Sequence, residues 1–411
     1  MISVSTFRAF RAKSVLISES IASKRGIQLS IFANFTAALC WWTLAAFRQV
    51  LLPVPIQGRH VVFWRRGYLK MLKIEMADFR RRYHVRRLTL SEKIQTASTA
   101  GHRPIGPLKF AVVRRQLRPV FPKTMTTRIS RVQQVLHWKR VNSMLNWLFE
   151  VENIGKMSIR ENCEKMYRFL RKNEADRRVS GFTVDVTKCF STVDHHILVS
   201  LLESIIDKNA TAIFSIRGFG RDEHNRYKDV CCSASTEHRA HEMLREKMAA
   251  RRVAEYRKTR IEKTSSKWLL DELRTTIRSY FYRRGQKTWK VTRGVPQGHP
   301  LSSHLAHLYL AAFETDYWRG TAEKRGESTD YCRYEDDFLI CTTEEATVKK
   351  MLDPLFSGLN TYNLVANRSK TQISSRHLSW CGVEIDLKRA KFATRRKCSD
   401  GKYRFLPIKF Q

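Results

Sequence analysis

Acidic residues are scarce in this chain. Its 411 residues include 38 Asp and Glu against 76 Lys and Arg, which gives a formal net charge of +38. An excess of positive charge of this size opposes compaction unless a polyanion neutralises it. The composition therefore predicts a nucleic acid as the partner.

Cysteine pairs and repeats are also missing. The nine cysteines are scattered, Cys231 and Cys232 are adjacent, and no C-x-x-C motif occurs. This spacing argues against a disulfide framework and a zinc ribbon, and it suits a reducing compartment. No internal repeat and no low-complexity tract occurs. With 43% hydrophobic residues over this length, we expect two or three globular domains with a sizeable core.

One uncharged run, Leu29–Phe47, is long enough to cross a bilayer. It contains polar residues such as Asn34, and two prolines, Pro53 and Pro55, follow soon after it, so we expect a buried helix and no membrane contact. Residues Met1–Ser18 contain three basic residues and no acid. They resemble a mitochondrial presequence, a pattern that many basic N-termini share.

Two adjacent acids stand out in the segment Tyr331–Thr342, which reads Y-C-R-Y-E-D-D-F-L-I-C-T. Strand-forming residues flank Asp336 and Asp337, so we expect a hairpin with the carboxylates at or beside its turn. Adjacent acids repel each other and resist burial unless a positive charge meets them. The pair is therefore either a solvated turn or part of a metal site.

Two further motifs precede this hairpin. The segment Phe182–Val186 reads F-T-V-D-V, a short apolar strand in which burying Asp185 is costly unless it has a partner. The segment Gly294–Ser302 reads G-V-P-Q-G-H-P-L-S. It predicts a glycine-punctuated loop that leads into an amphipathic helix from about Ser303 to Trp318.

Other segments are basic. Aromatic residues alternate with arginines in Val61–Tyr68, which is typical of a helix with a basic face or of an RNA-contacting surface. The segment Leu117–Arg128 predicts a hairpin with one cation on each arm, a pair that could clamp a triphosphate. From His238 to Lys263 most residues favour a helix. We expect His195 and His196 to lie on the surface, because no matching ligand set is nearby.

The strand with one acid, the G-V-P-Q-G loop and the double-aspartate hairpin follow each other in an order that resembles motifs A, B and C of reverse transcriptases. The resemblance implies an α+β fold: a right-hand palm and fingers, with an antiparallel sheet backed by helices, preceded by a mostly helical RNA-binding domain. It implies an RNA-directed DNA polymerase in which Asp185, Asp336 and Asp337 hold two Mg²⁺ ions. Hard oxygen ligands suit Mg²⁺, and two such ions can stabilise both oxygens of an in-line displacement.

The resemblance also assigns residues to the incoming dNTP. Lys123 and Arg128 match the fingers cations that hold the triphosphate. Phe190 matches the bulky residue that excludes a 2′-hydroxyl. Gln297 and Gly298 match the loop that borders the nucleotide and the template.

Two later segments resemble motifs D and E. Lys370 matches the lysine of motif D, a candidate proton donor to pyrophosphate. Trp380, Cys381 and Gly382 match the primer grip, and this W-C-G triplet is typical of telomerase.

Three more features resemble telomerase reverse transcriptase in particular. Leu301 and Ser302 follow the P-Q-G loop where most relatives carry Ser-Pro. The distance from Asp185 to Gly294 is far wider than a minimal palm needs and resembles telomerase's insertion in the fingers. The segment Val61–Leu72 resembles the T motif, which assigns RNA contacts to five residues: Phe63, Trp64, Arg65, Arg66 and Tyr68.

The resemblance divides the chain into three parts. Residues 1–105 match a telomerase-RNA-binding domain, residues 106–386 match fingers and palm with an insertion at about 199–280, and residues 387–411 form a short basic tail, a thumb remnant. The sequence before about residue 35 is too short for telomerase's N-terminal DNA-anchoring domain. Glu335 stands where relatives usually have a small or apolar residue, and it either repels primer phosphates or adds a metal contact.

The implied function is the extension of chromosome 3′ ends with telomeric repeats. The expected partners are a telomerase RNA template, a single-stranded telomeric DNA primer and dNTPs, and the expected location is the nucleus, at telomeres. One alternative is an intron-encoded or retroelement reverse transcriptase, in which case the N-terminus suits mitochondria. Another is a catalytically inactive RNA-binding scaffold, against which the three mutually repelling acids speak.

Overall fold

The computed structural model describes residues 38, 51–56, 59–93, 107–113, 116–121, 130–173, 179–208, 212–285, 287–320, 328–397 and 403–408. They belong to two compact units, Met1–Arg81 with Leu108–Phe121, and Arg82–Pro107 with Pro122–Gln411. Apart from Ala38, the uncharged run Leu29–Phe47 lies outside the described residues, as does Met1–Ser18. Among the described helices, none is both long and apolar enough to cross a membrane.

The described strands of the first unit form two hairpins, which accompany helix α3. Strands β1 (Leu51–Ile56) and β2 (Arg59–Trp64) pair antiparallel, and α3 (Arg65–Arg82) begins directly after them. Strand β5 (Gln116–Val120) pairs with the preceding strand, β4 (Lys109–Val113), so the described part of the predicted Leu117 hairpin uses an upstream partner. The Phe79 ring of α3 lies 6.0 Å from that of Phe121, which joins α3 to the second hairpin.

Helices of the second unit begin at side-chain caps. Ser130 and Ser158 each accept the backbone N–H three residues later, and Gln133 and Glu161 reach back to complete two capping boxes. These caps fix the starts of α5 (Arg131–Val151) and α6 (Ile159–Lys172). The other helices described in this unit are α7 (Cys189–Thr192), α8 (His195–Lys208), α9 (Glu237–Ala250), α10 (Ser266–Arg278), α11 (Ser302–Glu314), the π-helix η1 (Thr315–Arg319) and α13 (Glu345–Ser357).

A four-stranded antiparallel sheet carries the acidic motifs. Its strand order is β13-β14-β6-β15, and its strands are β13 (Thr329–Tyr334), β14 (Asp337–Thr342), β6 (Ser180–Asp185) and β15 (Gln372–Ser374). Side chains alternate between the two faces. Leu339 belongs to a core cluster with Phe169 of α6, whereas Phe338 packs edge-to-face on Trp318 of η1, 4.6 Å between centroids. The sheet is thus covered on both faces.

Helix α11 differs from the amphipathic helix that the sequence predicts. Residues Leu305–Ala311 are all buried, as are Ser302 and Phe313. The helix packs against α7, α8 and η1, so it has little solvent-facing surface. A helix surrounded by other elements is apolar on most sides, because no face is left for water.

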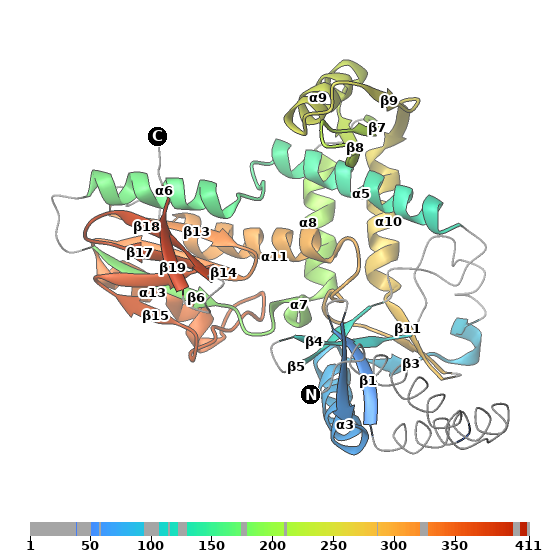
Figure 1. Cartoon of the computed structure of the whole chain (residues 1–411), viewed down its shortest axis with the longest axis horizontal. Coiled ribbons are helices and arrows are strands. Elements are labelled where there is room, and N and C mark those ends of the chain that lie inside the picture. Colours follow the sequence, from blue (N-terminus) through green and yellow to red (C-terminus); the bar gives the residue numbers. More distant parts are fainter. Residues whose placement is uncertain are drawn as a thin grey trace, which may run out of the picture. The chain divides into compact units, whose positions relative to one another are not determined.

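A second antiparallel sheet, β16-β17-β18-β19, extends the core (Figure 1). Its strands are β16 (His377–Trp380), β17 (Val383–Asp386), β18 (Lys391–Lys397) and β19 (Tyr403–Pro407). Leu378, Trp380 and Ile385 share one buried cluster with α6 and the acidic sheet. The described part of the basic tail therefore forms two strands of this sheet.

A long insertion separates β6 from the P-Q-G loop. It contains β7 (Ala212–Arg221), β8 (Tyr227–Ala234), α9, β9 (Tyr256–Lys258) and β10 (Glu262–Ser265), grouped around one part of α5 (Figure 1). The prediction of a helix over His238–Lys263 is wrong beyond Ala250, because β9 and β10 pair with β7 there. Tertiary pairing overrides the local helix preference.

Ionic contacts fasten the insertion to α5. The Asp229 carboxylate accepts hydrogen bonds from Lys139 Nζ of α5 at 2.6 Å and from Arg217 Nε at 2.8 Å. Ser233 Oγ of β8 also donates to Ser143 Oγ of α5, and both hydroxyls are buried. These contacts satisfy polar groups at the interface, so the insertion is mounted firmly on the helix.

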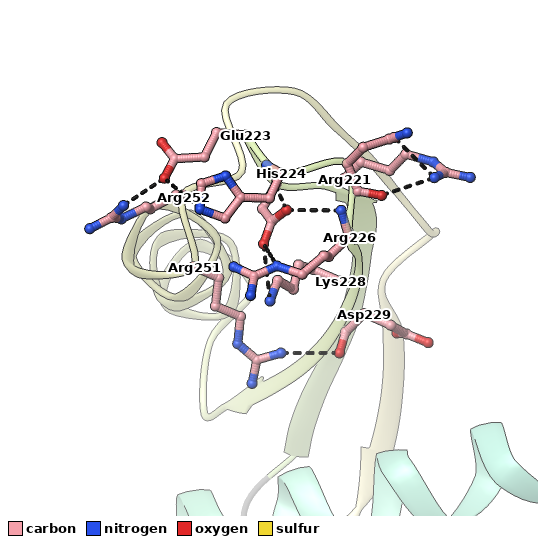
Figure 2. Close-up of polar contacts among 10 residues, drawn as sticks. Arg221, Glu223, His224, Arg226, Lys228, Asp229, Arg251 and Arg252 are labelled. Carbon is pink, nitrogen blue, oxygen red and sulfur yellow. Dashed lines mark hydrogen bonds and ion pairs between the residues drawn. The ribbon is translucent and has the colours of Figure 1, made fainter. Parts of the chain in front are cut away.

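The tip of the insertion is a tight turn between β7 and β8. The buried Asp222 carboxylate accepts backbone N–H bonds from His224 and Arg226 and ion pairs with the Arg226 side chain at 2.9 Å. Figure 2 shows Glu223 in contact with Arg252, and their ion pair measures 2.5 Å. The end of α9 is thereby tied to the turn.

The remaining described strands form a small sheet next to the P-Q-G loop. They are β11 (Phe281–Arg284), β12 (Lys287–Lys290) and β3 (Arg86–Arg87), in the order β11-β12-β3.

The packing of Gly220 in β7 yields a prediction. A Cβ at this position would lie 2.6 Å from the Glu255 carbonyl oxygen and 2.9 Å from Val253 Cγ1, and the backbone cannot give way cheaply. We expect Gly220→Ala to destabilise the insertion by about 1–3 kcal/mol, measured by urea denaturation and by amide exchange of β7 and β9. Gly155→Ala is the control, since nothing lies within 4 Å of its Cβ. Equal stability of the two variants would contradict this packing.

Candidate active site

Three carboxylates meet at one end of the acidic sheet. Asp185 is the last residue of β6 and Asp337 the first of β14, and the two are direct partners in the strand register. Asp336 lies in the turn before β14, and the Val186 N–H donates to its carbonyl at 3.2 Å. One ligand oxygen from each of Asp185, Asp336 and Asp337 lies within 4.8 Å of the others. Strand pairing thus brings together acids that are far apart in the sequence.

The acids disturb one another electrostatically. Burial raises the pKa of Asp336, and the negative charge of Asp185 adds to this effect. Burial, followed by the charges of Asp336 and Asp185, raises the pKa of Asp337 to about 6. Like charges held this close favour a proton or a cation between them. An all-oxygen donor set of three carboxylates therefore fits a hard divalent ion such as Mg²⁺.

Asp185 is oriented by two donors from one turn. Lys370 Nζ lies 2.9 Å from Asp185 Oδ2, and Asn367 Nδ2 donates to the same oxygen at 3.0 Å. The Asn367 backbone N–H also donates to the Asp185 carbonyl at 2.7 Å. Because Lys370 is 62% exposed, its ammonium group reaches the site from solvent.

The W-C-G triplet contacts Asp337. Trp380 Nε1 donates to the Asp337 carbonyl at 3.3 Å, and Cys381 Sγ lies 3.7 Å from Asp337 Oδ2. Cys381 and Gly382 both have positive φ, 49° and 80°, in the two-residue turn between β16 and β17. Such turns need left-handed residues at both positions, which explains the glycine. An open pocket of about 360 Å³ lies between this turn, Lys370 and the acids Asp185 and Asp337.

The P-Q-G loop is tied to the segment that follows β6. The Val295 N–H donates to the Phe190 carbonyl at 2.8 Å, so the loop carrying Gln297 and Gly298 lies beside α7. Gly294 has φ 80°, and a Cβ there would lie 2.8 Å from the Phe190 carbonyl oxygen, so only glycine fits. The structure therefore places Phe190 and this loop on adjoining segments.

His195 is not the surface histidine that the sequence predicts. Its Nε2 lies 2.8 Å from the Gly294 carbonyl oxygen, and burial lowers its pKa. Its ring also meets Tyr280 edge-on, 5.9 Å between centroids. His195 thus holds the start of the P-Q-G loop through the Gly294 carbonyl, whereas His196 is exposed.

For several predicted site residues the structure gives no placement relative to the acids. Lys123 and Arg128 lie outside the described residues. The five residues assigned to RNA are in the first unit, at the end of β2 and the start of α3: Phe63, Trp64, Arg65, Arg66 and Tyr68. Trp64 is 70% exposed, which leaves its ring available for stacking on a base.

Sequence reasoning missed Asn367. Its spacing from Lys370 was the available signal, since the Lys370 N–H donates to the Asn367 carbonyl in a turn at 3.0 Å. Residues at the two ends of one turn can reach the same acceptor. Asn367 and Lys370 thus place two donors on Asp185 from one turn.

Comparisons with known proteins agree with this geometry. The family described as "Reverse transcriptase (RNA-dependent DNA polymerase)" matches residues 242–385, which include the P-Q-G loop and the double aspartate. Telomerase reverse transcriptase of Oryzias latipes is 30% identical over 104 residues, 25% of this chain and 9% of that protein. That of Takifugu rubripes is 21% identical over 241 residues, 49% of this chain and 22% of that protein. The matched part is thus under a quarter of either relative.

Solved structures give the same fold. The telomerase of Candida albicans in complex with a TWJ fragment of telomeric RNA superposes with a TM-score of 0.59 at 15% identity, over 89% of this chain and 58% of that one. The apo telomerase of Candida tropicalis gives 0.61 at 15% identity, over 84% and 57%. These findings confirm the α+β polymerase fold and the resemblance to telomerase reverse transcriptases.

The raised pKa of Asp337 yields a prediction for the metal-free protein. Its pKa in the folded state, about 6, lies above the ordinary 3.8. The protonated form therefore favours folding below pH 3.8, and this contribution is lost as the pH rises through 6. We expect Asp337→Asn to be more stable than the natural protein at pH 7 in EDTA, and equally stable near pH 4, as measured by thermal unfolding.

The control for this comparison is Asp353→Asn, an exposed acid of α13, which should show no such pH dependence. Added Mg²⁺ should raise the melting temperature of the natural protein more than that of Asp337→Asn, because an ion that binds only the folded state stabilises it. A melting difference that stays constant from pH 4 to pH 7 would contradict the raised pKa of Asp337.

Proposed function

We propose that this chain, which carries a reverse transcriptase domain and resembles the telomerase reverse transcriptases, is an RNA-directed DNA polymerase that extends chromosome 3′ ends. The observation that carries the proposal is the meeting of Asp185, Asp336 and Asp337 at one sheet end, beside Lys370 and an open pocket. Oxygen ligands on two adjacent strands form the rigid, concentrated charge that nucleotidyl transfer needs.

In this proposal the three aspartates hold two Mg²⁺ ions. When bound, these ions would lower the pKa of the primer 3′-hydroxyl and stabilise charge on the attacking and leaving oxygens. Asn367 keeps the Asp185 carboxylate oriented through its bond to Oδ2. Rigid positioning matters because small misplacements of reacting groups cost large factors in rate.

The surrounding residues bind and orient the substrates. Lys370 supplies a proton to the leaving pyrophosphate, because its ammonium lies next to Asp185 at the rim of the pocket. Phe190 excludes the 2′-hydroxyl of a ribonucleotide, and the loop at Gln297 and Gly298 borders nucleotide and template. The triphosphate is held by the cations Lys123 and Arg128.

The primer strand is oriented next to Asp337 by the turn that contains Trp380, Cys381 and Gly382. Trp380 and Cys381 are hydrogen-bonded to Asp337. In the first unit, the exposed Trp64 and the arginines Arg65 and Arg66 bind RNA, the aromatic ring by stacking and the cations through phosphates. We place the protein in the nucleus, at telomeres, with an RNA template and a single-stranded DNA primer.

Primer extension tests the polymerase assignment. With the purified chain, an RNA template, a DNA primer, dNTPs and Mg²⁺, we expect primer elongation, and we expect Asp336→Asn to lose more than about 100-fold in rate, since even outer-shell changes at metal sites cost 10–100-fold. Asp353→Asn should match the natural protein. Undiminished extension by Asp336→Asn would end the polymerase assignment.

The RNA that copurifies with a tagged chain tests the telomeric assignment. We expect an RNA that contains the complement of the chromosome-end repeat, and a tagged protein found at telomeres in the nucleus. Recovery of the transcript of an intron or a mobile element, or localisation to mitochondria, would favour a retroelement enzyme instead. Extension activity without a repeat-encoding RNA would keep the polymerase and remove the telomeric role.

A further inference from the structure

The turn of the acidic hairpin carries a fourth acid, Glu335, whose carboxylate contacts Ser303 and Lys156. Ser303 Oγ donates to Glu335 Oε1 at 3.2 Å and lies 3.3 Å from Oε2. Lys156 Nζ lies 3.7 Å from Oε1. Among the described residues, the cluster able to hold a metal comprises Asp185, Asp336 and Asp337 without Glu335.

The partners of Glu335 come from two other segments. Lys156 lies in the loop between α5 and α6, and Ser303 lies in the first turn of α11, directly after the P-Q-G loop. Lys156 Nζ donates to the Ser303 carbonyl at 3.1 Å and also to its hydroxyl. Ser303 therefore receives a hydrogen bond from the lysine and passes one on to the glutamate.

A second contact fixes the backbone of the same turn. Arg333 Nη1 donates to the Glu335 carbonyl at 2.9 Å, and the Arg333 guanidinium is paired with Glu314 of α11. Glu335 itself has a positive φ of 54°, a conformation that costs energy for a non-glycine residue. The surrounding bonds hold the turn in this conformation, and the two aspartates follow directly.

The charge of Glu335 matters because of where it lies. Burial and Asp185 raise the pKa of Asp336, and the Glu335 charge acts in the same direction. An unneutralised fourth carboxylate here would repel the phosphates of any strand that approaches the acids. Lys156 is only 31% exposed, and burial lowers its pKa while the Glu335 carboxylate opposes that shift. The Glu335 carboxylate thus favours the charged form of the Lys156 side chain.

We propose that Lys156, Ser303 and Glu335 form a clasp that positions the Asp336–Asp337 turn on α11 and neutralises Glu335, so that the primer strand can approach the acids. This inference rests on the proposed polymerase function. Lys156 and Ser303 are positioning residues in it, because they act through Glu335 and the turn. The clasp joins the start of α11, directly after the P-Q-G loop, to the turn that carries two of the three metal-binding acids.

A double-mutant cycle tests the clasp. Lys156→Met leaves Glu335 without its cation, and we expect the KM for primer–template to rise about tenfold with a smaller change in kcat. Glu335→Gln keeps an acceptor for Ser303 and removes the charge, so its KM should rise about threefold or less. The double variant should return close to the level of Glu335→Gln, because no unpaired acid remains.

Two further variants separate charge from structure. Lys156→Arg keeps the cation and should retain a KM close to that of the natural protein. Lys349→Met removes an exposed lysine of α13 and controls for the general loss of positive charge. A double variant as impaired as Lys156→Met, or a Lys156→Met variant no worse than Lys349→Met, would overturn the clasp.

A readout without catalysis keeps this test apart from the proposed function. Anisotropy of a labelled primer–template duplex, measured without dNTPs, should show the same order of affinities across the cycle. Should the natural protein bind duplex but fail to extend it, the polymerase proposal falls, while the binding cycle still supports or overturns the clasp. Thermal melting of each variant confirms that it is folded.

Discussion

Mutual repulsion among Asp185, Asp336 and Asp337 is the constraint on which this structure depends. Burial, together with the charge of the neighbouring carboxylates within 4.8 Å, raises the pKa of Asp336 and Asp337 and opposes folding of the metal-free chain. They stay together because β6 and β14 are buried, paired in register and covered on both faces. The two donors on Asp185, one neutral and one cationic, offset part of the repulsion without filling the site. The end of the sheet thus carries a concentrated negative charge that a bound divalent cation would neutralise.

The parts of the site that lie on strands could be predicted from the sequence. An acid inside the apolar run Phe182–Val186 and an acid pair between two strand-forming runs both break a local rule, and such breaks mark functional positions. The pairing of Asp185 with Asp337 follows once the two strands are neighbours. The strand order, with β6 between β14 and β15, comes from packing that no single segment encodes. For the same reason the donors on Asp185 and the contacts of Trp380 and Cys381 with Asp337 became visible only in three dimensions.

Other expectations failed where the surroundings decide. Helix α11 begins where its sequence predicts and η1 continues it to Arg319, yet α7, α8 and η1 bury nearly all of α11. Nothing in the sequence around His195 predicts its contact with the Gly294 carbonyl of the P-Q-G loop. The segment after Ala250 favours a helix locally, and pairing with β7 makes strands of it. Glu335 illustrates the same point: its partner Lys156 is distant in sequence, so its role could not be read from the hairpin alone.

Helix α5 has one further consequence. Its middle holds the insertion through Lys139 and Ser143, and its C-terminal end leads into the loop that contains Lys156. A helix of 21 residues is a rigid element, and the polar contacts of Lys139 and Ser143 hold the insertion in place along it. A ligand that binds the turn at Asp222 would therefore act on the same helix that leads to the acidic hairpin. The insertion is therefore a rigid attachment to the helix that leads to the acidic hairpin.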